Sequence, residues 1–253
     1  MRQEVFGGFV LLRWSRFALV LLLCVSSLPL FAKTKEKDST TKVVDSGKFG
    51  IFVNGNRVGT EAFTVEQTTT GSVTHCDLTI EQGGSKIEQK SDMQLAQNGD
   101  LLRYEWKELS PGKAWSVVTP DNSFLLEHLY SGDKGKPFDR PFLMPASTVI
   151  LDDFFFTHRE LLAWRYVGSS CKPGTQCNLT KTKFGGLIPH TASPIEINIE
   201  YKGVEKLPVK GEPTDMTRFD LTVDGVNWMM WMDSNYKVQR ILVPDSNTEV
   251  LRD

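Results

Sequence analysis

The stretch VILDDFFFTHRELLAWRYV, residues 149–167, decides the fold, because it is the one long segment with the periodicity of an amphipathic helix. At about 100° per residue, its apolar side chains share one arc of the helix and most charged side chains share the other. The polar arc contains Asp152, Asp153, Thr157, Arg159 and Glu160. His158 and Arg165 are exceptions, because they project from near the middle of the apolar arc.

The segments before this helix have the pattern of short antiparallel strands. Apolar and polar residues alternate in runs near 49–53, 58–65, 73–81, 86–96, 101–109, 115–119 and 124–130. Turn pairs such as Asn54-Gly55, Asn98-Gly99 and Pro111-Gly112 separate these runs at hairpin spacing. We therefore expect an antiparallel meander, followed by a long loop over 131–145 that leads into the helix.

The segments after the helix also alternate, and one hairpin is specified in detail. Asp224-Gly225 is typical of a two-residue type I′ turn, which would pair Leu221 with Trp228 and Phe219 with Met230. The return strand also carries Met229 and Trp231 on its opposite face, so it is apolar on both sides. Such a strand is either covered twice or lines a ligand cavity.

The first thirty-two residues have the features of a secretory signal. Basic residues precede an apolar run over 17–25, and a small residue, Ala32, follows at a suitable distance for cleavage. A retained anchor is the alternative, although the span 17–32 is shorter than the roughly 20 residues that a spanning helix needs. We expect residues 1–32 to be removed, 33–46 to be a disordered spacer, and 47–253 to form one domain in the periplasm or outside the cell.

Cysteine spacing predicts one disulfide. Cys171 and Cys177 bracket Pro173-Gly174, a pair that suits a tight turn, and an exported chain permits oxidation. Two free thiols are the alternative. Cys76 lies in a strand pattern and is expected to be a small buried apolar side chain rather than a nucleophile.

Three short segments resemble a known kind of domain. They are GKFGIFVNGNRVG at 47–59, WMD at 231–233 and LVP at 242–244. The chain in this respect resembles uncharacterised bacterial periplasmic domains whose fold is similar to that of the periplasmic lipoprotein carrier. The resemblance implies a strongly curved antiparallel sheet, an open half-barrel, with a helix packed on its concave face. It assigns no functional residue to this sequence.

Several kinds of chemistry have no signature in the chain. The four histidines show no metal-ligand spacing, and no nucleophile elbow, phosphate loop or dinucleotide fingerprint occurs. The net charge is −2, so no basic excess indicates nucleic acid binding. We therefore expect a protein that is not an enzyme, without a metal, a cofactor or, after cleavage, a stable membrane span.

Two functions remain as hypotheses. In the first, the concave sheet binds or carries an apolar ligand such as an acyl chain or lipid, with a ligand site formed by His158, Arg165, Phe154, Leu161, Leu162, Trp228 and Met230. In the second, the helix fills the half-barrel and a sheet edge docks onto another envelope protein. Arg165 is expected to need an anionic partner, which is a buried carboxylate of the sheet in the second hypothesis and a ligand head group in the first.

Overall fold

One sheet and one α-helix make up the computed structural model, which describes residues 41–132, 135–152, 155–171, 174, 177–209 and 211–253. The strands before the helix are β1 (Lys42–Val53), β2 (Asn56–Gln67), β3 (Gly71–Gln82), β4 (Ser85–Ala96), β5 (Leu101–Ser110), β6 (Trp115–Asp121), β7 (Phe124–Tyr130), β8 (Phe138–Phe142) and β9 (Val149–Ile150). The helix is α1 (Thr157–Ser170). It is followed by β10 (Thr182–Ile188), β11 (Ser193–Val209), β12 (Glu212–Val223), β13 (Val226–Met232), β14 (Val238–Val243), the short 3-10 helix η1 (Pro244–Ser246) and β15 (Thr248–Arg252).

The fifteen strands of the described residues form a single open sheet. Their order is β8-β7-β6-β5-β4-β3-β2-β1-β15-β14-β13-β12-β11-β10-β9, so the first and last strands of the chain meet in the middle. β9 and β10 pair in parallel, because α1 forms the long crossover between them, whereas the other neighbours are antiparallel. The sheet ends at β8 and β9 without closing. The predicted large antiparallel sheet is confirmed.

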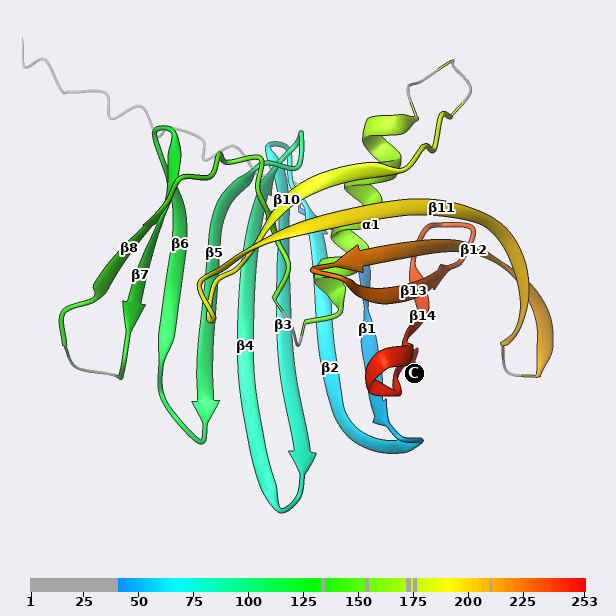
Figure 1. Ribbon diagram of the computed structural model, residues 1–253, viewed down its shortest axis with the longest axis horizontal. Coiled ribbons are helices and arrows are strands. Elements are labelled where there is room, and N and C mark those ends of the chain that lie inside the picture. Colours follow the sequence, from blue (N-terminus) through cyan, green and yellow to red (C-terminus); the bar gives the residue numbers. More distant parts are fainter. Residues whose placement is uncertain (1–40, 133–134, 153–154, 172–173, 175–176, 210) are drawn as a thin grey trace, which may run out of the picture. The chain divides into compact units, whose positions relative to one another are not determined.

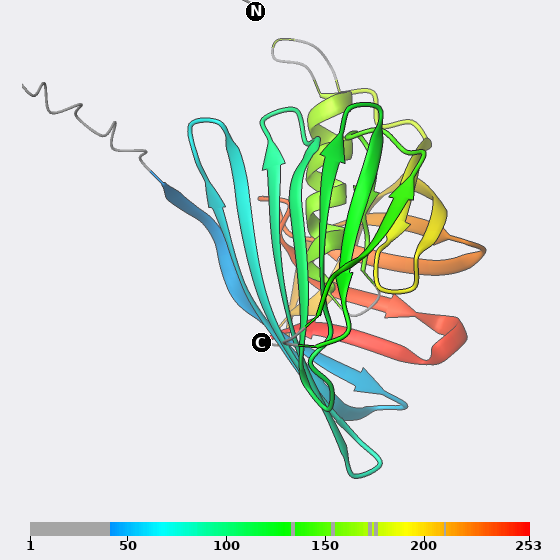
Figure 2. The same cartoon turned by 90° about the vertical axis from the view of Figure 1, so that its left-hand side faces the viewer.

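The sheet is strongly curved, and α1 packs on its concave side. β10–β13 run across the direction of β2–β5, and the helix lies between these two halves (Figures 1 and 2). Side chains of α1 reach both halves, since His158 contacts Ser91 on β4 and Tyr166 packs edge-on against Phe219 on β12. The predicted architecture, a mainly β fold with one helix in a curved sheet, is therefore correct.

The helix begins later than its sequence periodicity predicts. Val149 and Ile150 form strand β9, and α1 starts at Thr157 rather than at position 149. The reason is a distant contact: Glu61 on β2 accepts hydrogen bonds from the backbone N–H groups of Phe156 and Thr157, at 2.7 and 3.2 Å. A carboxylate at a helix N-terminus satisfies otherwise unpaired N–H groups and interacts favourably with the positive end of the helix dipole.

The charged arc of the helix is buried, which is a second difference from the prediction. Arg159 and Glu160 are buried because the sheet covers this side of α1 as well. The guanidinium of Arg159 lies 4.2 Å above the Trp228 ring and donates to the backbone oxygens of Asp152 and Phe155. Glu160 accepts a 2.6 Å hydrogen bond from the backbone N–H of Val238.

Two further segments are more ordered than the sequence indicates. Residues 42–46, expected within a disordered spacer, belong to β1, where the buried Asp45 accepts two 2.7 Å hydrogen bonds from Arg252 on β15. Phe138–Phe142, expected within a loop, forms the edge strand β8. In both cases pairing with a neighbouring strand, β2 for residues 42–46 and β7 for β8, supplies backbone hydrogen bonds that local sequence does not reveal.

The hairpin around Asp224-Gly225 has the predicted register. Leu221 pairs with Trp228, Phe219 with Met230, and Val223 with Val226. On the opposite face of β13, Trp231 is buried and donates a 2.9 Å hydrogen bond to Glu205. Met229, on the same face, is only half-buried, so this face of β13 is shielded in part, and no β13 residue lines the cavity described below.

Candidate functional site

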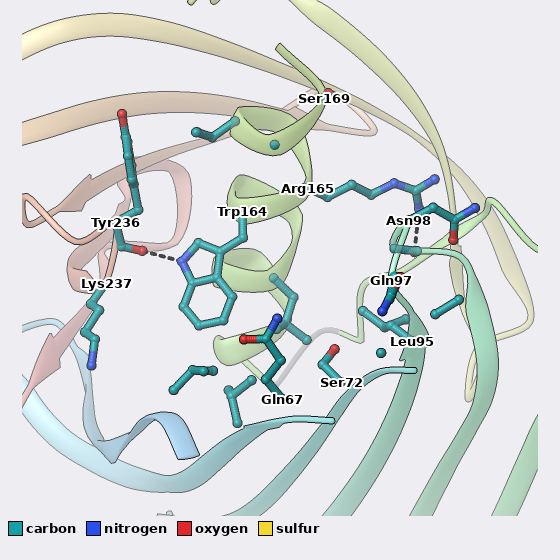
Figure 3. A pocket seen from close by; sticks show the side chains of 18 of the residues that line it. Gln67, Ser72, Leu95, Gln97, Asn98, Trp164, Arg165, Ser169, Tyr236 and Lys237 are labelled. Carbon is teal, nitrogen blue, oxygen red and sulfur yellow. Dashed lines mark hydrogen bonds between the residues drawn. The ribbon is translucent and has the colours of Figure 1, made fainter. Parts of the chain in front are cut away.

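A cavity of about 1220 Å³ lies beside α1 and is partly open to solvent. One wall comes from the helix, through Leu161, Trp164, Arg165, Val167, Gly168 and Ser169. The facing wall comes from β1–β4, through Val44, Val65, Gln67, Ser72, Leu95 and Ala96. Figure 3 shows the cavity between the helix and these strands. Its volume exceeds the roughly 300–1,000 Å³ of most ligand pockets.

Trp164 projects from α1 into the cavity (Figure 3). Its indole Nε1 donates a 2.5 Å hydrogen bond to the backbone oxygen of Tyr236, in the loop between β13 and β14. Because the polar end of the ring is satisfied, its apolar face is left as part of the cavity wall.

Arg165 leaves the helix in a different direction, toward Asn98 (Figure 3). Its guanidinium donates to the backbone oxygen of Gly99 at 3.1 Å and to the carboxylate of Asp100 at 3.3 Å. Both acceptors belong to the turn between β4 and β5, so the expected acidic partner is present. The Asp100 side chain is 32% exposed, however, and is not the buried carboxylate that was expected.

Lys237 is the second cationic side chain of the cavity, on the side of Tyr236 (Figure 3). Its Nζ lies 2.9 Å from Asp45, a carboxylate that is also held by Arg252 at 2.7 Å. Burial and the neighbouring Asp45 raise the pKa of Glu160 well above its ordinary value. Asp45 therefore keeps a cationic partner even without Lys237.

His158 lies outside the cavity lining, in the core between α1 and the sheet. Its Nδ1 accepts a 3.3 Å hydrogen bond from the backbone N–H of Asp152, which assigns the ring proton to Nε2 and makes Nε2 the donor to Ser91 at 3.3 Å. Burial lowers the pKa of His158 to about 3, so the ring is neutral. His158 therefore lies apart from Arg165, which lines the cavity.

Asp152, between β9 and α1, is a buried carboxylate with two side-chain partners among the described residues. It accepts a 2.7 Å hydrogen bond from the Tyr104 hydroxyl and lies 2.6 Å from His190 Nδ1. Burial alone would raise the pKa of Asp152, but the His190 and Tyr104 contacts outweigh burial and the pKa lies below its ordinary value. Within the described part of the chain, no group of three or more His, Cys, Asp or Glu side chains is arranged to hold a metal ion.

The predicted site residues are divided between the cavity and the core. Leu161 and Arg165 line the cavity, whereas Leu162 and Met230 are buried in the core, Trp228 packs beneath Arg159, and none of these three lines the cavity. Phe154 lies outside the residues that the structure describes. Sequence reasoning missed the cavity residues Trp164, Tyr236, Lys237, Gln97 and Asn98. The Asn98-Gly99 turn was recognised, but nothing local indicated that it would face the helix.

The disulfide between Cys171 and Cys177 is present and closes a short loop directly after α1. Cys76 is a buried free cysteine. No helix in the described ranges is both long and apolar enough to cross a membrane. Comparisons with protein-family models, with curated proteins and with solved structures found no match for this chain.

Proposed function

We propose that this chain is an exported, periplasmic half-barrel protein that binds or carries an apolar ligand, such as an acyl chain or lipid, in the cavity beside α1. The observation that carries this proposal is the cavity itself. A helix that only plugged the sheet would leave no such space, whereas about 1220 Å³ lies between the helix and β1–β4.

The lining supports an apolar ligand with one polar end. Val44, Val65, Leu95, Leu161 and Trp164 provide an apolar surface that can remove hydrocarbon from water. The amides of Gln97 and Asn98 lie on the same side as Arg165 (Figure 3). Gln67, Ser72 and Lys237 add polar groups elsewhere in the lining. An apolar surface with a few polar groups is typical of small-molecule sites.

Export is part of the proposal. The signal-like order of basic, apolar and small residues at the start of the sequence supports it. The Cys171–Cys177 disulfide agrees with an oxidising compartment such as the periplasm. N-terminal sequencing of the mature protein is expected to give Lys33 as the first residue, and retention of Met1 in the membrane fraction would contradict export.

Mass spectrometry of organic extracts from protein purified from its native compartment tests the binding function. We expect an apolar compound in stoichiometric amount. In the variant Gly168→Phe, a side chain is added at a lining position where a Cβ meets no atom within 4 Å. This variant should fold and lose the extracted compound because the added ring occupies the cavity.

Gly185→Phe is the matched control, because Gly185 also has open space around its Cβ but is exposed on β10 outside the cavity lining. It should keep the compound. Equal amounts of compound from both variants, or none from the parent protein, would contradict binding in this cavity.

A second candidate function, docking onto another envelope protein, is favoured by the edge strand β8. Phe138 on this strand and Leu143 directly after it are 63% and 95% exposed. An unpaired strand edge with apolar side chains can accept a strand from a partner. Cross-linking through a cysteine introduced at Leu143 in intact cells should capture one specific protein if docking is the function.

A further inference from the structure

Both charged residues that line the cavity are cations, and the aspartates that pair with them, Asp100 and Asp45, lie outside the lining. Arg165 and Lys237 line it, and among the lining residues that the structure describes there is no Asp or Glu. The whole sequence has a net charge of −2, so this bias does not follow from composition. A lining that combines apolar side chains with cationic ones favours an amphiphile whose head group is negative.

Arg165 is the better placed of the two cations to bind such a head group. Its Nη1 donates to Gly99 and its Nη2 donates to Asp100, which uses two of the five N–H donors of a guanidinium. The other three N–H donors of the guanidinium have no hydrogen-bond acceptor among the described residues. A guanidinium binds carboxylates and phosphates with paired, directional hydrogen bonds.

Asp100 is a partner of Arg165 that the head group of a ligand can replace. Its contact with Arg165 is long, at 3.3 Å, and its other carboxylate oxygen accepts a 2.8 Å hydrogen bond from Asn98. Since the Asp100 side chain is 32% exposed, it can be solvated when Arg165 turns to a ligand. Exchange of one carboxylate for another anion would leave no buried charge unpaired.

We propose that the cavity binds an amphiphile with an anionic head group, a carboxylate or a phosphate, and that Arg165 binds this head group in exchange for Asp100. The apolar tail lies against Trp164 and the aliphatic wall of β1–β4. This inference rests on the proposed function, because it assigns the head group of the ligand that the same cavity holds.

Isothermal titration of the purified protein, after removal of co-purified apolar material, tests the inference with four probes of equal chain length. The probes are decanoate, decyl phosphate, 1-decanol and decyltrimethylammonium. Both anions should bind about tenfold or more tightly than decanol, because hydrogen bonds to charged groups contribute at least about that factor. The cation should bind weakest. The tighter of the two anions identifies the head group as carboxylate or phosphate.

Two variants should move the preference for anions in opposite directions. Arg165→Met should bring decanoate and decyl phosphate to the affinity of decanol and leave decanol binding unchanged. Asp100→Asn removes the competing carboxylate, keeps the side-chain size, and should strengthen anion binding. Lys237→Met is the control for the second cation and should retain most of the preference.

The outcomes separate the two proposals. If decanol binds as tightly as the anions, or if Arg165→Met keeps the preference, the assignment of an anionic head group to Arg165 is wrong while apolar binding stands. Loss of the preference in Lys237→Met alone also overturns the assignment to Arg165. If none of the four probes binds, both the head-group assignment and the proposed function are wrong.

Discussion

Glu61 and Phe156 are 95 positions apart in the chain and are joined by a 2.7 Å hydrogen bond from the Phe156 backbone N–H to the Glu61 carboxylate. This bond fixes the start of the one helix that forms a wall of the cavity. Burial is the main cause that raises the pKa of Glu61, to about 7, although the hydrogen bonds from the helix oppose it. The position of the helix therefore depends on a group that titrates near neutral pH.

Glu61→Gln should change how stability depends on pH. The pKa of Glu61 is about 7 in the folded protein against 4.5 as an ordinary value, so the folded state binds this proton more tightly. The contribution of this proton to the free energy of unfolding is therefore fully present below about pH 4.5 and is lost as the pH rises to about 7. Urea unfolding at several pH values should show the stability of Glu61→Gln, relative to the parent, rising by about 3 kcal/mol across this window. A difference that is constant with pH would contradict the raised pKa.

His158→Asn should show the opposite trend. The pKa of His158 is lowered to about 3 from 6.5, so the unfolded state binds this proton more tightly. The contribution of His158 is present above about pH 6.5 and is lost as the pH falls toward 3. The stability of the variant relative to the parent should therefore rise on acidification below pH 6.5. Between about pH 4.5 and 6.5, Glu61 makes the free energy of unfolding fall with rising pH and His158 makes it rise. The two effects largely cancel in the parent protein.

Arg165→Met and Arg252→Met should differ strongly in stability, although both remove an arginine that pairs with an aspartate. Asp100 is 32% exposed, so loss of Arg165 should lower the free energy of unfolding by about 1 kcal/mol or less. Asp45 is 1% exposed and takes two hydrogen bonds from Arg252. Loss of Arg252 would leave Lys237 as the one described cationic partner of this buried carboxylate and should cost about 2 kcal/mol or more. Thermal and urea unfolding of the two variants at pH 7.5 make the comparison. Equal losses would mean that the two aspartates have similar environments in solution.

Replacing Cys171 and Cys177 with serine should have a small effect. The bridge joins positions six apart, and closing such a short loop is worth about 2 kcal/mol in the unfolded chain. The double variant should unfold at a lower urea concentration but keep its affinity for cavity probes, because neither cysteine lines the cavity. A Cys76-linked peptide in non-reducing peptide maps of the parent protein would contradict the pairing.

Features that depend on neighbouring residues could be predicted from the sequence. The turn residues Asp224-Gly225 alone determine the register that pairs Leu221 with Trp228. The spacing of Cys171 and Cys177 likewise predicts their bridge, and the repeated turn pairs predict the meander of β1–β7.

Features that depend on distant contacts could not be predicted. The start of α1 depends on Glu61, and the burial of Arg159 and Glu160 depends on Trp228 and Val238, which lie on other strands. A helical wheel distinguishes an apolar arc from a polar one, but it does not reveal that a curved sheet covers both. For the same reason Arg165 was recognised as important, while its neighbours in the β4–β5 turn were not.

The order of the strands has a mechanical consequence for the cavity. One wall belongs to β1–β4, and the other belongs to α1, whose ends continue toward β9 and β10 at the opposite end of the strand order. The two walls are connected through the bend of the sheet, and also directly, through the hydrogen bonds of Glu61 to the start of α1 and of Arg165 to the β4–β5 turn. Of these two direct connections, the one through Arg165 lies in the cavity lining. Under the proposed function, a ligand that draws Arg165 away from Asp100 would loosen this connection, while the Glu61 hydrogen bonds keep the start of the helix in place.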